Sequence, residues 1–83
     1  MGTEEELKQE TEKWLEKIKQ ERKKISSSNK GDFLKNIDSY ISDSQHFLEE
    51  GRLILAFEAV VWAWAYMEIG KQEGIIRTAW YFW

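Results

Sequence analysis

LILAFEAVVWAWAYMEI, at residues 53–69, is the stretch of this sequence that decides the fold. Its only charged side chains are Glu58 and Glu68, and neither Pro nor Gly interrupts it. Such a run forms a helix that is apolar on nearly all sides, and a helix of that kind has to be covered by neighbours on more than one side. We therefore predict a core helix over about residues 53–73, buried between two amphipathic helices.

The faces of this predicted helix differ in the size of their side chains. At about 100° per residue, the small residues fall on one strip. That strip consists of Ala56, Ala59, Ala63 and Gly70. Two bulky strips consist of Phe57, Val61 and Trp64, and of Leu55 and Trp62. We expect the small strip to let one neighbouring helix approach closely and the bulky strips to fill the core.

Two segments upstream have the pattern of amphipathic helices. In residues 4–25, apolar and small side chains recur at alternating steps of four and three, which is typical of a helix that packs on other helices. Residues 32–50 carry a second apolar stripe, which Ser44 interrupts. Gly51 then suits the left-handed conformation that ends many helices. The polar stretch at 26–31 separates the two segments as a short loop.

These segments predict an all-α fold, a three-helix up-and-down bundle with a short apolar C-terminal tail. We expect a single domain over residues 1–83, because a chain of this length has no room for a second one. The absence of Pro favours uninterrupted helices. Five Trp, four Phe and three Tyr supply large buried areas, which offset the small core of so short a chain.

The composition excludes several classes of site and argues against others. The absence of Cys rules out disulfides, thiolate metal sites and cysteine nucleophiles. A formal charge of −3 disfavours nucleic-acid binding, although basic side chains within 19–24 keep it as a third alternative. The apolar run is near the lower length limit for a transmembrane helix, and Glu58 would lie in mid-bilayer at a cost of about 2–3 kcal/mol. We expect no membrane span and, since no targeting segment is visible, a cytoplasmic protein.

One group of side chains has the spacing of metal ligands, namely Asp43, His46 and Glu50. Steps of three and four place them on one side of the predicted second helix, and carboxylate with imidazole suits zinc or iron. A complete site would need further ligands from other helices, and the chain has a single His. We favour a surface face on which His46 meets neighbouring carboxylates, with a metal-binding or hydrolytic site as the alternative.

Glu58 is the candidate for a buried charge, because it lies within the apolar helix. A buried carboxylate without a partner would have a raised pKa, which is one mark of a functional group. Alternatively Glu58 lies on an exposed edge of the helix, or pairs with Arg52 or with a Lys of the first helix. We favour this second interpretation, because carboxylates are seldom fully buried.

Four consecutive aromatic residues end the chain, namely Trp80, Tyr81, Phe82 and Trp83. We expect Gly74 to end the third helix, so these residues belong to a short, almost wholly apolar tail. Either the tail folds back as a lid on the core, or it is an exposed surface for docking or self-association. The four aromatic residues are therefore the candidate partner-binding residues.

The second and third predicted helices resemble an archaeal family of short helical proteins, domain-of-unknown-function family three hundred and fifty-seven. The residues that carry this resemblance are Tyr40, Asp43, HFLE at 46–49, Gly51, AFEAV at 56–60, Ala63, Gly70 and GI at 74–75. They extend over about residues 37–75. The resemblance implies a three-helix bundle from the cytoplasm of an archaeon, and it implies no activity. The aromatic tail departs from the usual ending of the family.

No catalytic signature is present in the sequence, and we expect no cofactor. The leading prediction is a non-enzymatic protein-interaction or scaffold module. Its partner would be another protein or a second copy of the chain, in a homodimer that forms through the tail or through an apolar groove.

Overall fold

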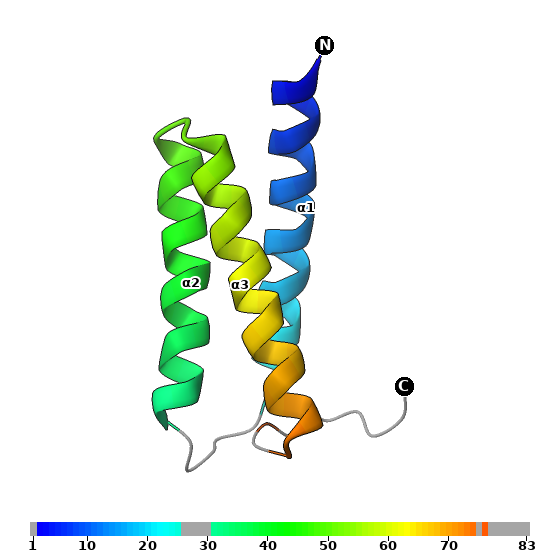
Figure 1. Ribbon diagram of the computed structural model, residues 1–83, viewed down its shortest axis with the longest axis vertical. Helices are drawn as coiled ribbons and strands as arrows, with labels where there is room; N and C mark the ends of the chain where they lie inside the picture. Colours follow the sequence, from blue (N-terminus) through cyan, green and yellow to red (C-terminus); the bar gives the residue numbers. More distant parts are fainter. Residues whose placement is uncertain (1, 26–30, 75, 77–83) are drawn as a thin grey trace.

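The computed structural model describes residues 2–25, 31–74 and 76. It contains three helices, α1 (Thr3–Lys23), α2 (Gly31–Glu49) and α3 (Leu53–Gln72). They run alternately down, up and down (Figure 1), and no strand occurs in the described residues. The predicted all-α three-helix bundle is therefore confirmed, and each helix end lies within two residues of its predicted position.

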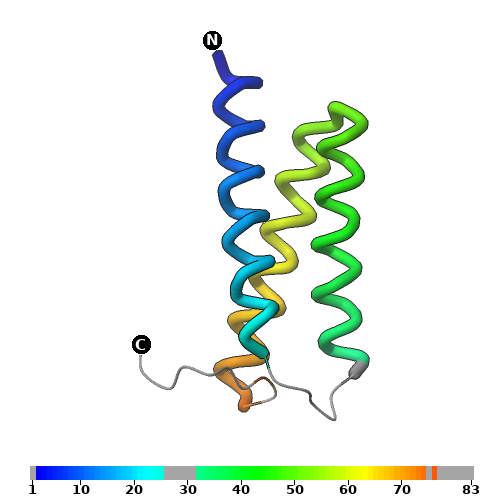
Figure 2. Tube along the Cα trace, turned by 180° about the vertical axis from the view of Figure 1, so that it is seen from behind, coloured from blue at the N-terminus to red at the C-terminus, as the bar shows by residue number. Residues whose placement is uncertain are grey.

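α3 holds the bundle together, because it packs against both other helices. The contact between α2 and α3 is the most extensive, and α1 packs on α3 more than on α2. Seen from behind, α1 crosses the lower part of α3, while α2 lies beside α3 (Figure 2). The two amphipathic helices thus share α3 as their apolar partner, as the sequence predicts.

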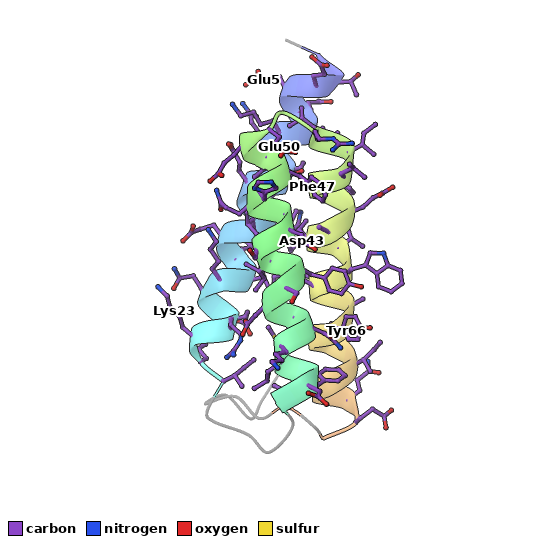
Figure 3. All side chains as sticks on the ribbon, turned by 90° about the vertical axis from the view of Figure 1, so that its left-hand side faces the viewer. Glu5, Lys23, Asp43, Phe47, Glu50 and Tyr66 are labelled. Atoms are coloured by element: carbon purple, nitrogen blue, oxygen red, sulfur yellow. The ribbon has the colours of Figure 1, made fainter. Side chains whose placement is uncertain are left out.

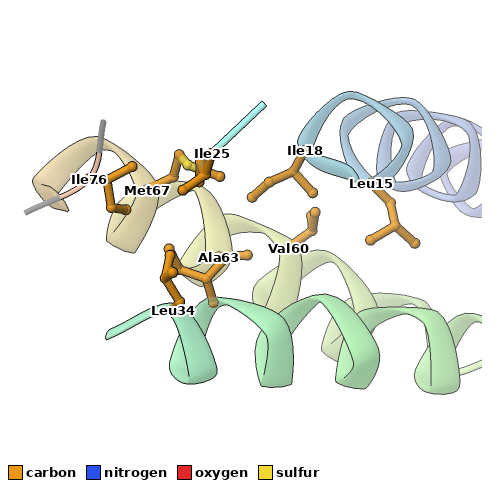
Figure 4. Close-up of a cluster of buried hydrophobic side chains, with 9 residues drawn as sticks. Leu15, Ile18, Ile25, Leu34, Val60, Ala63, Met67 and Ile76 are labelled. Carbon is orange, nitrogen blue, oxygen red and sulfur yellow. The ribbon is translucent and has the colours of Figure 1, made fainter. Parts of the chain in front are cut away.

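The core receives side chains from all three helices and from the chain just beyond two of them. Figure 4 shows these residues meeting between the helices. The buried side chains of the core include Leu15 and Ile18 of α1, Leu34 and Ile37 of α2, and Val60 and Met67 of α3. Ile25 and Ile76, which follow α1 and α3, are also buried and close the lower end of the bundle.

The small strip of α3 is buried, as predicted, and Ser44 of α2 contacts the α3 backbone beside it. The Ser44 hydroxyl is fully buried and donates a hydrogen bond of 2.8 Å to the carbonyl oxygen of Ala56. A small residue is needed here, since a larger side chain would push α2 away from α3. The interruption in the apolar stripe of α2 is therefore a point of close contact between the two helices.

A Schellman motif joins α2 to α3. Gly51 has a φ of 78°, its N–H donates to the carbonyl of Leu48, and the N–H of Arg52 donates to the carbonyl of Phe47. The Arg52 guanidinium lies 5.7 Å from the centre of the Phe47 ring, in the place where this motif usually has an apolar contact. The turn therefore reverses the chain within a few residues and starts α3 against α2.

Gly70 lets the chain fold back after α3. Gly74 ends the helix with a φ of 77°, and the N–H of Ile76 donates to the carbonyl of Gly70 at 3.0 Å. A β-carbon at Gly70 would clash with the Ile76 side chain and would lie 2.7 Å from Cε2 of Phe33. Gly70 is thus a packing requirement, and Ile76 covers the place where a side chain would otherwise be.

The Ser44 contact predicts a specific loss of stability. Ser44→Ala removes one buried hydrogen bond, and we expect it to lower the free energy of unfolding by about 1 kcal/mol. Chemical denaturation monitored by circular dichroism measures this loss. Ser42→Ala, at an exposed position of the same helix, is the matched control. Equal stability of the two variants would contradict the role of the hydroxyl.

Gly70→Ala separates packing from helix propensity. Propensity alone favours Ala by up to about 1 kcal/mol, whereas overpacking costs about 1–3 kcal/mol. We expect a net loss of stability in thermal unfolding. The penalty should shrink when Gly70→Ala is measured in an Ile76→Ala background, because one of the two clashing side chains is then gone. A stabilised Gly70→Ala variant would contradict this interpretation.

Candidate interaction surface

One side of α3 faces away from both other helices and remains largely apolar. We call it the outer face of α3, and it consists of Ile54, Glu58, Val61, Trp62, Ala65 and Ile69. The exposed fractions of its large apolar residues are 67% for Ile54, 47% for Val61, 55% for Trp62 and 49% for Ile69. The described residues expose one further large apolar side chain to a comparable extent, Trp14 of α1.

This exposure corrects the prediction that α3 is buried between its neighbours and that its bulky strips fill the core. Val61 and Trp62 are exposed, whereas Val60 and Met67, on the side next to the small strip, fill the core. The reason is geometric, since two helices with one apolar stripe each cover only two sides of a third helix. The sequence shows one apolar stripe on α1 and one on α2, and this number would have predicted that one face of α3 stays uncovered.

Aromatic rings border the outer face along the seam between α2 and α3. Trp62 stacks on Tyr40 of α2, with ring centres 6.3 Å apart, and Tyr40 stacks on Tyr66 at 5.5 Å. Phe33 meets Tyr66 edge-on at 5.4 Å. Figure 3 shows Tyr66 on α3, close to α2. These contacts hold Trp62 in one orientation although more than half of its surface is open to solvent.

Apolar surface continues on the other border of the outer face, between α3 and α1. Trp64 meets Trp14 edge-on, with ring centres 5.8 Å apart. The indole N–H of Trp64 donates a hydrogen bond of 3.2 Å to the backbone carbonyl of Trp14. Phe57, Leu7 and Trp14 line a shallow hollow above this pair. The outer face therefore has a half-buried aromatic border on each side.

Charged side chains near Trp14 orient its ring. The Trp14 indole N–H donates to the Glu10 carboxylate at 3.0 Å, and the Lys13 ammonium lies 3.2 Å from the same carboxylate. The bond from Lys13, followed by that from Trp14, lowers the pKa of Glu10. The Lys17 ammonium lies 4.9 Å from the centre of the ring. Cations thus surround Trp14, which sets it apart from the outer face of α3.

Glu58 is exposed, so it is not a buried charge. It lies on the outer face because its position on α3 is nearly opposite the buried small strip. Among the described residues it has no ion-pair or hydrogen-bond partner, so neither the predicted pairing with Arg52 nor that with a Lys of α1 forms. The exposed-edge interpretation is the one that the structure supports.

The candidate metal ligands Asp43, His46 and Glu50 all lie on the surface of α2. His46 Nε2 lies 2.9 Å from Oε2 of Glu50, and both side chains are exposed. Asp43 lies lower on α2 than Glu50 (Figure 3), and it is exposed as well. Within residues 2–25, 31–74 and 76, no three His, Asp or Glu side chains come together in a way that could hold a metal ion. The arrangement matches the favoured surface interpretation.

Two basic side chains of α1 hold this helix against α2. Arg22 forms a two-pronged ion pair with Asp38 of α2, at 2.7 and 3.0 Å, and Lys19 donates to Gln45 at 2.8 Å. Lys24 pairs with Glu21 at 3.5 Å. Contacts with α2 therefore account for Lys19 and Arg22, while Lys24 pairs with a residue of α1 itself.

Length and composition alone make α3 the one described helix that could cross a membrane. Its mean hydropathy is 1.5, and 33% of the apolar window is buried inside the bundle. Core helices of bundles meet the same criteria of length and composition, so these criteria do not distinguish a span from a core helix. Trp80, Tyr81, Phe82 and Trp83, the predicted partner-binding residues, lie outside the described residues.

Comparisons with known proteins agree on one family. A family model described as a protein of unknown function (DUF357) matches residues 8–76. Protein AF1782 from Archaeoglobus fulgidus, which is assigned to the same family and has a crystal structure, shares 53% sequence identity with this chain. That similarity covers 92% of this chain and 97% of the other, with a TM-score of 0.84. A comparison with curated proteins finds no match.

The exposed pair of His46 and Glu50 predicts no response to metal. We expect millimolar zinc to leave the Tm of the purified protein unchanged, because two exposed side chains on one helix do not complete a zinc site. An ion that did bind the folded state, at 100 times its Kd, would add about 2.7 kcal/mol of stability. Differential scanning calorimetry with and without zinc measures the shift. A saturable rise in Tm that disappears in His46→Gln would contradict the expectation.

Proposed function

The chain belongs to the protein family of unknown function DUF357, and from the surface of α3 we propose that it is a non-enzymatic protein-interaction module. In this proposal the outer face of α3 is the interface, and the rest of the bundle presents it. A cytoplasmic location and the absence of a nucleic-acid partner belong to the same proposal, and both rest on the sequence.

The observation that carries the proposal is the amount of apolar surface left open on one helix. From their exposed fractions, the four large apolar residues of the outer face together expose roughly 400 Å². Contiguous patches of this size on small proteins often mark binding sites. The total accessible surface is 5870 Å², so these four side chains supply roughly 7% of it.

The way in which the patch is held also supports binding. Trp62 is fixed by its stacking on Tyr40, so little side-chain entropy is lost when a partner covers it. Tryptophan is enriched among the residues that contribute most to interfaces. The patch lies on a helix in the middle of the fold, which keeps its side chains at fixed spacing. A preorganised apolar helix face suits a helical partner.

Two other sequence-based candidates have less support. The alternative metal-binding or hydrolytic function would need Asp43, His46 and Glu50 to converge with further ligands. In the described residues the exposed His46 pairs with Glu50, and no three such ligands come together. The aromatic tail keeps its place as a second candidate for partner binding. The proposal does not depend on it, because it uses only residues of α3.

Variants on the outer face should separate binding from stability. Trp62→Gln removes a side chain that is more than half exposed, and we expect it to lower the free energy of unfolding by about 1–2 kcal/mol, mainly through the lost stacking on Tyr40. Met67→Ala, in the core, should cost about 2–5 kcal/mol. A similar loss of stability in the two variants, measured by chemical denaturation, would show that Trp62 belongs to the core instead.

Site-specific photo-crosslinking tests the interface itself. A photoreactive residue at Val61 should form an adduct in extracts of the native cells, and one at the exposed position Ser39 should not. The captured protein is identified by mass spectrometry, purified, and tested for binding to wild type and to Trp62→Gln. Binding that Trp62→Gln weakens at least tenfold supports the proposal. Equal labelling at both positions, or equal binding by both proteins, would remove it.

A further inference from the structure

We propose that the occupant of the outer face of α3 is a second copy of this chain, packed antiparallel about a two-fold axis between Val61 and Trp62. This inference rests on the proposed function, since it names the partner of the same surface. Three properties of the outer face support it, namely its spacing, its charges and its area.

The residues of the outer face are spaced symmetrically along α3 about the midpoint between Val61 and Trp62. Its six residues, from Ile54 to Ile69, follow one another at steps of four, three, one, three and four. In an antiparallel pair whose axis passes between Val61 and Trp62, Ile54 lies at the height of the partner's Ile69. Each end of the patch then meets an isoleucine. A two-fold interface requires this kind of self-complementarity, because the same patch serves both subunits.

The charges favour the antiparallel arrangement over the parallel one. A parallel pair in register would place Glu58 beside the partner's Glu58 and Glu68 beside the partner's Glu68. In the antiparallel pair Glu58 lies at the height of the partner's Ala65. Because the side chain of alanine is small, the Glu58 carboxylate can still reach solvent. The two Glu58 residues are then seven residues apart in height, about 10 Å at 1.5 Å per residue. The like charges are thereby separated by about one Debye length.

The area of the patch sets the expected strength of the dimer. A stable interface buries about 800 Å² per partner, and the four large apolar residues supply roughly half of that. The half-buried borders at Tyr66 and Phe57 extend the contact. An interface of this size, with an unpaired carboxylate near its middle, corresponds to a weak dimer at the low end of specific interfaces.

Glu58 distinguishes a second copy from a basic partner. In the antiparallel dimer Glu58 has no cation to pair with, so Glu58→Gln should tighten self-association about threefold to tenfold. A different protein that uses Lys or Arg to recognise Glu58 would bind Glu58→Gln more weakly. Sedimentation equilibrium across a concentration series measures the dimer Kd of the full-length wild type and of this variant. Val61→Glu is the disruptive control and should be monomeric with an unchanged circular dichroism spectrum.

Cross-linking tests the antiparallel geometry, and the absence of Cys makes each introduced thiol unique. With a short bismaleimide, Val61→Cys should form covalent dimers, because its two copies flank the axis. Ile54→Cys alone should not, since its two copies would lie about 22 Å apart along the helices. A mixture of Ile54→Cys and Ile69→Cys should give the mixed dimer. Ser39→Cys, exposed on α2, is the control for random collision.

Several results would overturn the inference, and they leave the proposed function distinguishable. A wild-type protein that stays monomeric up to about 1 mM, or efficient self-linking of Ile54→Cys, would rule out the antiparallel dimer. Cosedimentation with phosphatidylcholine–phosphatidylglycerol vesicles that Val61→Glu abolishes would assign the face to a membrane surface and remove both proposals. Photo-crosslinking to a different protein would overturn the second copy and keep the interaction module.

Discussion

The structure depends on the contact between the small strip of α3 and α2. Because Ala56, Ala59 and Ala63 have little bulk, Ser44 reaches the backbone of α3 and forms a hydrogen bond where an apolar side chain would otherwise stand. This contact fixes which side of α3 is buried. The orientation of every other side of the helix follows from it, including the side that Val60 and Met67 turn toward α1.

A limit on coverage follows from the same contact. α1 and α2 each bring one apolar stripe, and together they cover two sides of a helix that is apolar on three. The third side remains open with Val61, Trp62 and Ile69 exposed. A chain of 83 residues has a small core, so leaving this apolar side of α3 exposed gives up a substantial share of the apolar surface that it could bury. We therefore interpret the open side as a surface that is covered in another assembly.

Much of the fold was predictable from the sequence, because its signals are local. The helices followed from periodicity, and the C-terminal ends of α2 and α3 followed from Gly51 and Gly74, which have positive φ values. The state of Glu58 and the exposure of Trp62 were not predictable from periodicity alone, because they depend on which side of α3 the other helices choose. The favoured surface interpretation of His46 agrees with the structure, since an i to i+4 pair forms within one helix. The packing of Gly70 against Ile76 has no signal in the helical pattern.

The unequal contacts of α1 have a consequence for the order in which the molecule loses structure. α2 and α3 are joined by a tight turn and pack extensively, so they form a hairpin of low contact order. α1 is held mainly by α3, and shallow hollows along α1 between Thr3 and Lys19 are open to water. Amide protons in the first half of α1 should therefore exchange fastest, through opening events that leave the hairpin intact. We therefore expect α1 to separate from α3 before α2 and α3 separate from each other.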